Sequence, residues 1–173
     1  MENFEQRLTG GHPNSLGNTI EVVEQVLDNH IQFDELFNCY FSEDEIVRLR
    51  VSNAMKRICK VEKGLLIPYI DRFLTEISQI DQPSTKWTLA TLFAMLDKDF
   101  TAEQLAAAKS IVKTNLVEEP DWIVLNNSME TLAKWSKSDN DLKVWLKPQL
   151  ERLQNDPRNS VAKRAKKLSK TAT

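Results

Sequence analysis

A short segment recurs four times along this chain, and this repetition constrains the fold more than any other feature. Corresponding positions lie 40, 37 and 37 residues apart. A period of this length is typical of solenoids, in which each repeat is a helix pair that buries its apolar face against its neighbours. Written without gaps, the four segments are SEDEIVRLRVSNAMKRI (42–58), QPSTKWTLATLFAML (82–96), EPDWIVLNNSMETLAKW (119–135) and DPRNSVAKRAKKLSK (156–170).

The beginning of each segment predicts the start of a helix. Ser42 and Glu45 have the spacing of a capping box. The other three segments carry Pro83, Pro120 or Pro157 in their second position. Proline suits the first helical residue, because that residue needs no N–H donor. Apolar residues then recur at the intervals of an amphipathic helix, and the alignment places these columns in the core: Val47, Trp87, Val124 and Val161; Val51, Thr91, Ser128 and Ala165; and Met55, Met95 and Leu132.

The fold class is all-α, with about nine helices in antiparallel pairs, because no run shows the period-two alternation of a strand. We expect one domain over residues 18–170. Residues 1–17 include the turn-forming stretch TGGHPNSLG and predict a flexible N-terminal lead-in, and residues 171–173 predict a frayed tail. Apolar periodicity predicts the remaining helices near 18–28, 31–41, 65–78, 102–117 and 142–153.

Charge is distributed unevenly along the chain. The formal net charge is −2, but residues 1–142 hold 14 Lys and Arg against 23 Asp and Glu, a balance of −9. Residues 143–173 hold 9 against 2, a balance of +7. The positive end is therefore either a contact surface for an acidic partner or a solvated C-terminal helix.

Residues suited to chemistry are scarce. The chain has two histidines, and we expect Cys39 and Cys59 to be buried free thiols, with a redox role as the alternative. No metal, phosphate-loop or nucleophile–base motif is present, so the sequence predicts no metal, no cofactor and no enzymatic activity. The apolar runs are too short to span a membrane, and the first residues, MENFEQRL, are unlike a secretory signal. We expect a monomeric cytoplasmic protein without membrane contact.

The first repeat carries a resemblance to a known family. Asp44, Val47 and Arg48 match the D-x-x-V-R signature of HEAT-like repeats, and Asp156-Pro157 with Val161 is a second, weaker match. The chain over about 18–170 resembles a group of small bacterial HEAT-repeat proteins without assigned activity. This resemblance implies a right-handed α-α superhelix of the armadillo type with about four helix pairs. It also implies a scaffold that binds a protein or nucleic acid.

The second helix of each repeat is expected to line the concave side of such a superhelix. With the column of Val51 facing the core, the opposite helix face falls about two residues to either side. That face is basic, then apolar, then polar, then basic along the chain. The alternative is that the apolar members are buried and that the cations only confer solubility. The predicted partner-binding strip consists of Arg50, Asn53, Arg57, Phe93, Asn126, Asn127, Glu130, Lys163, Arg164, Lys167 and Lys170.

Two tryptophans are candidate hot spots. Trp87 and Trp135 fall on core positions, whereas Trp122 and Trp145 lie off the apolar stripe, and tryptophan is enriched at binding hot spots. The favoured function is a non-catalytic scaffold that binds a protein or peptide on its concave face. The alternative is a nucleic-acid-binding module that uses the basic C-terminal helix, with weak binding that falls steeply with salt.

Overall fold

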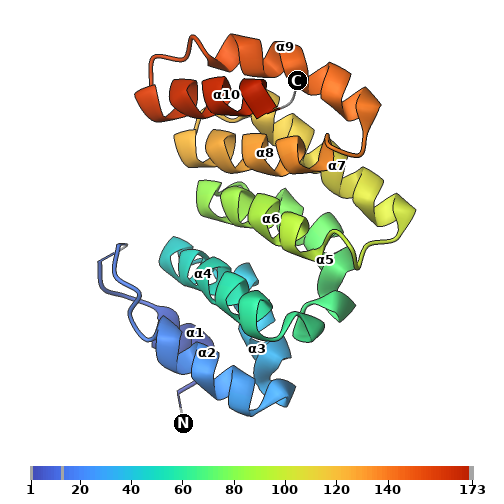
Figure 1. Ribbon diagram of the computed structural model, residues 1–173. Coiled ribbons are helices and arrows are strands. Elements are labelled where there is room, and N and C mark those ends of the chain that lie inside the picture. The colour runs from blue at the N-terminus through green and yellow to red at the C-terminus, as the bar shows by residue number, and fades with distance from the viewer. Residues whose placement is uncertain (1, 13, 172–173) are drawn as a thin grey trace. The chain divides into compact units, whose positions relative to one another are not determined.

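The computed structural model describes residues 2–12 and 14–171, and all regular structure in them is helical. Ten α-helices and five short 3-10 helices are present, and no strand occurs in this part of the chain, which confirms the predicted all-α class. The chain divides into two compact units, Met1–Thr88 and Leu89–Thr173. The boundary falls inside helix α6 (Pro83–Leu96), which is labelled in Figure 1.

Unit 1 is built around α4, the long helix of the first repeat. Helices α1, α2 and α3 pack against α4, and its apolar face is buried at Val47, Val51, Met55 and Ile58. Short 3-10 turns connect the helices of this unit. Its elements are α1 (Phe4–Leu8), α2 (Thr19–Asp28), η1 (His30–Gln32), α3 (Phe33–Asn38), η2 (Cys39–Phe41), α4 (Glu45–Val61), η3 (Lys63–Leu65), η4 (Ile67–Tyr69), α5 (Ile70–Thr75) and η5 (Ile77–Gln79).

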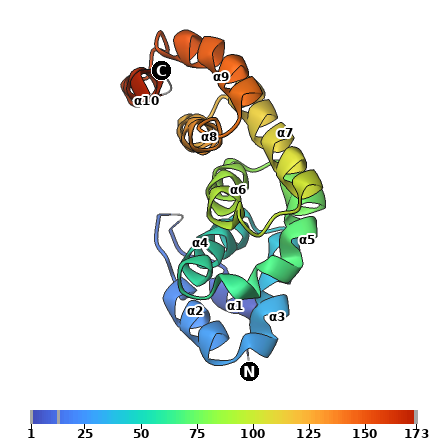
Figure 2. The ribbon, with the colours of Figure 1, turned by 45° about the vertical axis from the view of Figure 1, so that its right-hand side comes forward.

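Unit 2 is a two-layer stack of longer helices. Figure 2 shows α7 and α9 in one layer and α8 and α10 in the other. Helix α8 packs against α7, α9 and α10. Most of its side chains, both apolar and polar, are therefore buried. The helices are α6 (Pro83–Leu96), which begins in unit 1, α7 (Ala102–Glu118), α8 (Trp122–Trp135), α9 (Asn140–Leu153) and α10 (Asn159–Thr171).

The predicted helix starts are correct for two helices only. Helix α6 begins at Pro83, and Thr101 caps α7 through the backbone N–H of Gln104, as the capping-box pattern predicts. Helix α4 is instead capped by Asp44, and the Ser42 hydroxyl accepts from the backbone N–H of Asp44. A carboxylate just before the first turn satisfies the free amides at that point, so the helix begins after it.

The same reason moves the start of α8 past Pro120, and α10 also begins after its proline. The Asp121 carboxylate accepts from the backbone N–H groups of Ile123 and Val124, at 2.8 and 3.0 Å, so α8 begins after Pro120. Helix α10 begins two residues after Pro157. Pro148 lies inside α9 without ending it.

The predicted alignment of the second repeat is wrong by two residues. Trp87 and Thr91 are only half-buried, whereas eight other residues of α6 are buried: Ser84, Thr85, Thr88, Leu89, Ala90, Leu92, Phe93 and Leu96. The packing repeat therefore runs from Val47 to Thr85 to Val124 to Val161, with intervals of 38, 39 and 37 residues. Two residues correspond to a rotation of about 200° around a helix, so this slip places Trp87 and Thr91 outside the buried part of α6.

The N-terminal segment is more structured than its sequence predicts. Residues 1–17 contain α1, whose capping box is formed by Asn3 and Gln6 and whose Phe4 and Leu8 are buried. Residues 1 and 13 of the predicted lead-in and residues 172–173 of the predicted tail lie outside the described residues. No helix in the described ranges combines the length and the apolarity needed to cross a bilayer.

Candidate partner-binding surfaces

Helix α10 has the highest net positive charge of the helices among the described residues. It packs against α8 and α9 through a narrow apolar stripe. Val161 and Ala165 are its buried residues. Residues 159–171 contain no Asp or Glu. Cations spaced by three and four residues on one helix repel one another by a few tenths of a kcal/mol per pair. The exposed cations of this basic face are Lys163, Lys166, Lys167 and Lys170.

One ion pair joins the basic face to its neighbour. The half-buried Arg164 donates from Nη1 to the Glu130 carboxylate of α8. Within the described ranges, Lys163, Lys166 and Lys167 form no ion pair. Three lysine charges of the basic face are therefore balanced by solvent alone.

The neighbouring face of α8 is polar, and its groups are bonded to the preceding helix. The Asn127 amide donates to the Thr91 hydroxyl at 3.3 Å, and the Thr131 hydroxyl donates to the Ala90 carbonyl at 2.8 Å. Lys134 donates to the Ala94 carbonyl and pairs with Asp97. These bonds fix α8 against the C-terminal half of α6, and they leave Glu130 as the exposed carboxylate beside the basic face.

Three residues of the predicted strip are interior and cannot contact a partner. Phe93 is fully buried and meets the edge of Phe100 with ring centroids 5.8 Å apart, as expected from the two-residue slip. Asn126 is buried on α8, away from Asn127. Arg50 is 3% exposed, and its placement on a partner surface is also wrong.

Arg50 is an internal clamp for the N-terminal segment. Its Nη1 donates to the carbonyls of Leu8 and Thr9 at 2.6 and 3.1 Å, and its Nε donates to the carbonyl of Ser15 at 3.3 Å. Gly17 has a φ of +50°, and a Cβ there would lie 2.8 Å from the Arg50 guanidinium carbon. The residues that cover Arg50 have no helical periodicity, so no sequence pattern indicated that this arginine is buried.

The two remaining residues of the strip in unit 1 bond to each other. Arg57 donates from Nε to the Asn53 amide oxygen at 2.7 Å, one turn earlier on α4. Arg57 is exposed and Asn53 is half-buried. The structure therefore brings together Glu130 of α8 and Arg164 of α10 in unit 2, and Asn53 and Arg57 of α4 in unit 1.

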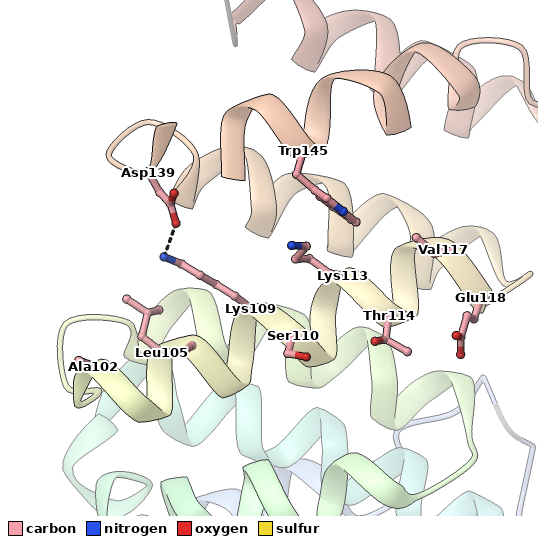
Figure 3. A pocket seen from close by; sticks show the side chains of 11 residues that line it. Ala102, Leu105, Lys109, Ser110, Lys113, Thr114, Val117, Glu118, Asp139 and Trp145 are labelled. Carbon is pink, nitrogen blue, oxygen red and sulfur yellow. Dashed lines mark hydrogen bonds and ion pairs between the residues drawn. The ribbon is translucent and has the colours of Figure 1, made fainter. Parts of the chain in front are cut away.

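Both tryptophans that the sequence singled out reach the surface of unit 2. Trp122 is 48% exposed in the first turn of α8. Trp145 is half-buried on α9 and forms the wall of a groove of about 750 Å³ that the sequence did not predict (Figure 3). The floor of this α7–α9 groove is the exposed face of α7, where small side chains recur at Ala102, Ala106 and Ser110.

Two lysines of α7 lie in the α7–α9 groove in different electrostatic situations. Lys109 pairs with Asp139 at 2.7 Å, and this ammonium lowers the pKa of the Asp139 carboxyl, which also caps α9 through the backbone N–H of Leu142. Lys113 lies over the ring of Trp145, 4.3 Å from its centroid, as a cation–π contact. The four-residue spacing of the two lysines and of the small side chains is the signal that was available in the sequence.

Comparison of this chain with protein-family models, with curated proteins and with solved structures gave no match.

Proposed function

We propose that this protein is a non-catalytic, HEAT-like scaffold that binds an acidic protein or peptide partner through the basic face of α10. The observation that carries the proposal is the charge of that helix. It buries two small or short side chains, exposes four lysines and contains no acidic residue. A carboxylate-rich partner relieves the repulsion among these lysines and gains electrostatic steering as it approaches.

Contacts between the starts of successive second helices support the HEAT-like repeat in this proposal. In unit 1, Arg48 of the D-x-x-V-R pattern donates from Nε to the Gln82 side chain at 2.6 Å, just before α6. In unit 2, Arg158, just before α10, donates to the carbonyl of Pro120, just before α8. An arginine thus joins the starts of neighbouring second helices in both units, as in a stack of similar repeats.

An acidic protein fits the surroundings of α10 better than nucleic acid does. Residues 159–171 contain no aromatic side chain on which a base could stack.

Affinity capture from native lysate, with and without nuclease, tests the proposal. The bait proteins are the wild type, the double variant Lys163→Glu/Lys167→Glu and the control Lys60→Glu/Lys98→Glu, which makes the same charge change at exposed positions outside α10 and α9. We expect an acidic protein that resists nuclease and is lost with the first double variant only. Capture that disappears with nuclease, together with duplex binding that survives about 0.15 M salt, would establish the nucleic-acid alternative instead.

A further inference from the structure

We propose that the α7–α9 groove is a second docking site, and that its occupant is an extended peptide segment with an acidic residue two positions from an aliphatic residue. This groove lies in the layer of α7 and α9, whereas the basic face belongs to α10 in the other layer (Figures 2 and 3). The proposal therefore does not depend on the function assigned to α10.

Two lysines and two carboxylates, Glu118 and Asp139, line the groove, and Lys113 is the lysine that can select an anion. Lys109 is neutralised by Asp139, but no carboxylate of the described residues pairs with Lys113. Its ammonium lies over the Trp145 ring, which orients the lysine along the wall of the groove without cancelling its charge. In Figure 3, Lys113 and Trp145 lie together above the exposed face of α7. A partner carboxylate at Lys113 gains an ion pair and leaves the cation–π contact intact.

The shape of the floor selects an extended segment beside that anion. Ala102, Ala106 and Ser110 are exposed and short, so a peptide backbone can approach α7 closely. Ser110 and Thr114 also line the groove, and their hydroxyls can bond to a peptide backbone. A side chain larger than alanine at position 106 would occupy this space.

The spacing of the partner residues follows from the helix. Val117 is 52% exposed and lines the groove one turn after Lys113. Four helical residues advance about 6 Å along the axis. Two residues of an extended chain cover about 6.6 Å, and side chains two positions apart point to the same face. A carboxylate at Lys113 and an aliphatic side chain at Val117 therefore belong to residues i and i+2 of the peptide.

A randomised 12-residue peptide library displayed on phage tests this inference, with the full chain as the target. We expect selected peptides to share an acidic residue and an aliphatic residue separated by one position. The matched variants are Ala106→Arg, which fills the groove, and Ala107→Arg, which adds the same side chain at an exposed position of α7 outside it. We expect a synthetic consensus peptide to bind Ala106→Arg at least tenfold more weakly than the wild type, and to bind Ala107→Arg with unchanged affinity.

Charge reversal at Lys113 gives an independent measurement. Selection against Lys113→Glu should replace the acidic residue of the consensus by a basic one, with circular dichroism showing that the variant is folded. Failure to enrich any sequence, or equal binding of the consensus peptide to both arginine variants, would overturn the proposal. So would a peptide that loses affinity with Lys163→Glu/Lys167→Glu but not with Ala106→Arg, and that outcome would support the proposed function of α10.

Discussion

Arg50 in unit 1 and Arg164 in unit 2 were both predicted on the second helix of a repeat, and their environments differ completely. Arg50 is buried among backbone carbonyls of the N-terminal segment, whereas Arg164 is half-buried and pairs with one exposed carboxylate. The difference is that Leu8, Thr9, Ser15 and Gly17 surround the Arg50 guanidinium, and none of the described residues covers α10 in this way. A cation at such a position therefore becomes a structural clamp or a surface charge according to what lies over it.

Removing the Arg50 side chain is expected to have the largest effect. Arg50→Ala leaves the carbonyls of Leu8, Thr9 and Ser15 without their donors in a buried site, which should lower the free energy of unfolding by about 3 kcal/mol. Urea unfolding followed by circular dichroism measures this change. Arg57→Ala, at an exposed position of the same helix, is the control and should cost less than about 0.5 kcal/mol. Equal losses for both variants would contradict the clamp.

The segment that covers Arg50 can be perturbed instead of the arginine itself. Gly17→Ala adds a Cβ 2.8 Å from the guanidinium carbon at a positive φ, and should cost about 2 kcal/mol. Gly10→Ala meets only the backbone penalty of its φ of +71°, about 1 kcal/mol, because no atom lies within 4 Å of its Cβ position. Thermal unfolding of the two variants compares them. A Gly10 variant that is less stable than the Gly17 variant would show that contact with Arg50 is unimportant.

The bond between Arg158 and the Asp156 carboxylate makes stability depend on pH, whereas Arg50 bonds to backbone carbonyls, which do not titrate. Arg158 holds the pKa of Asp156, ordinarily 3.8, at about 2 through bonds of 2.7 and 2.8 Å. A folded pKa below the unfolded value gives a stabilisation that is complete above about pH 4 and is lost as the pH falls toward 2. We expect Asp156→Asn to remove about 1 kcal/mol of stability at pH 7 and to flatten the loss between pH 4 and 2.

Urea unfolding at several pH values measures that slope. Asp141→Asn, at an exposed position of α9, is the matched control and should leave the acid dependence as it is in the wild type. An Asp156 variant with the same acid dependence as the wild type would mean that its contact with Arg158 contributes nothing to stability.

Removing Arg164 is expected to have the smallest effect on stability. Its pair with Glu130 is solvent-accessible, and such pairs contribute little, so Arg164→Ala should change the free energy of unfolding by less than about 0.5 kcal/mol. The same variant should nevertheless reduce capture of the acidic partner proposed for α10. A loss of stability as large as that of Arg50→Ala would remove the contrast between the two arginines.

The sequence predicted the parts of this protein that depend on local pattern. Apolar spacing located α2, α7 and α9 to within a few residues, and the capping box at Thr101 and Gln104 is present. The exact start of a helix depends on which side chain bonds to its first free amides. Asp44 and Asp121 form these bonds in α4 and α8, where the sequence had suggested Ser42 and Pro120. Of the candidate strip, the residues of α8 and α10 other than Asn126 reach the surface of unit 2, because α10 has a narrow apolar stripe that its sequence already shows.

The all-α class, the positions of the long helices and the cationic character of α10 follow from the sequence alone, because periodicity and composition act within a few turns of one helix. Which face of α6 is buried, what covers Arg50 and where Trp145 meets Lys113 were decided by tertiary packing. The physical reason is that a helix turns by about 100° per residue, so a slip of two residues exchanges its faces while leaving its periodicity unchanged. Only contacts with other elements distinguish the two alternatives, and those contacts join residues such as Leu8 and Arg50 that are far apart in the chain.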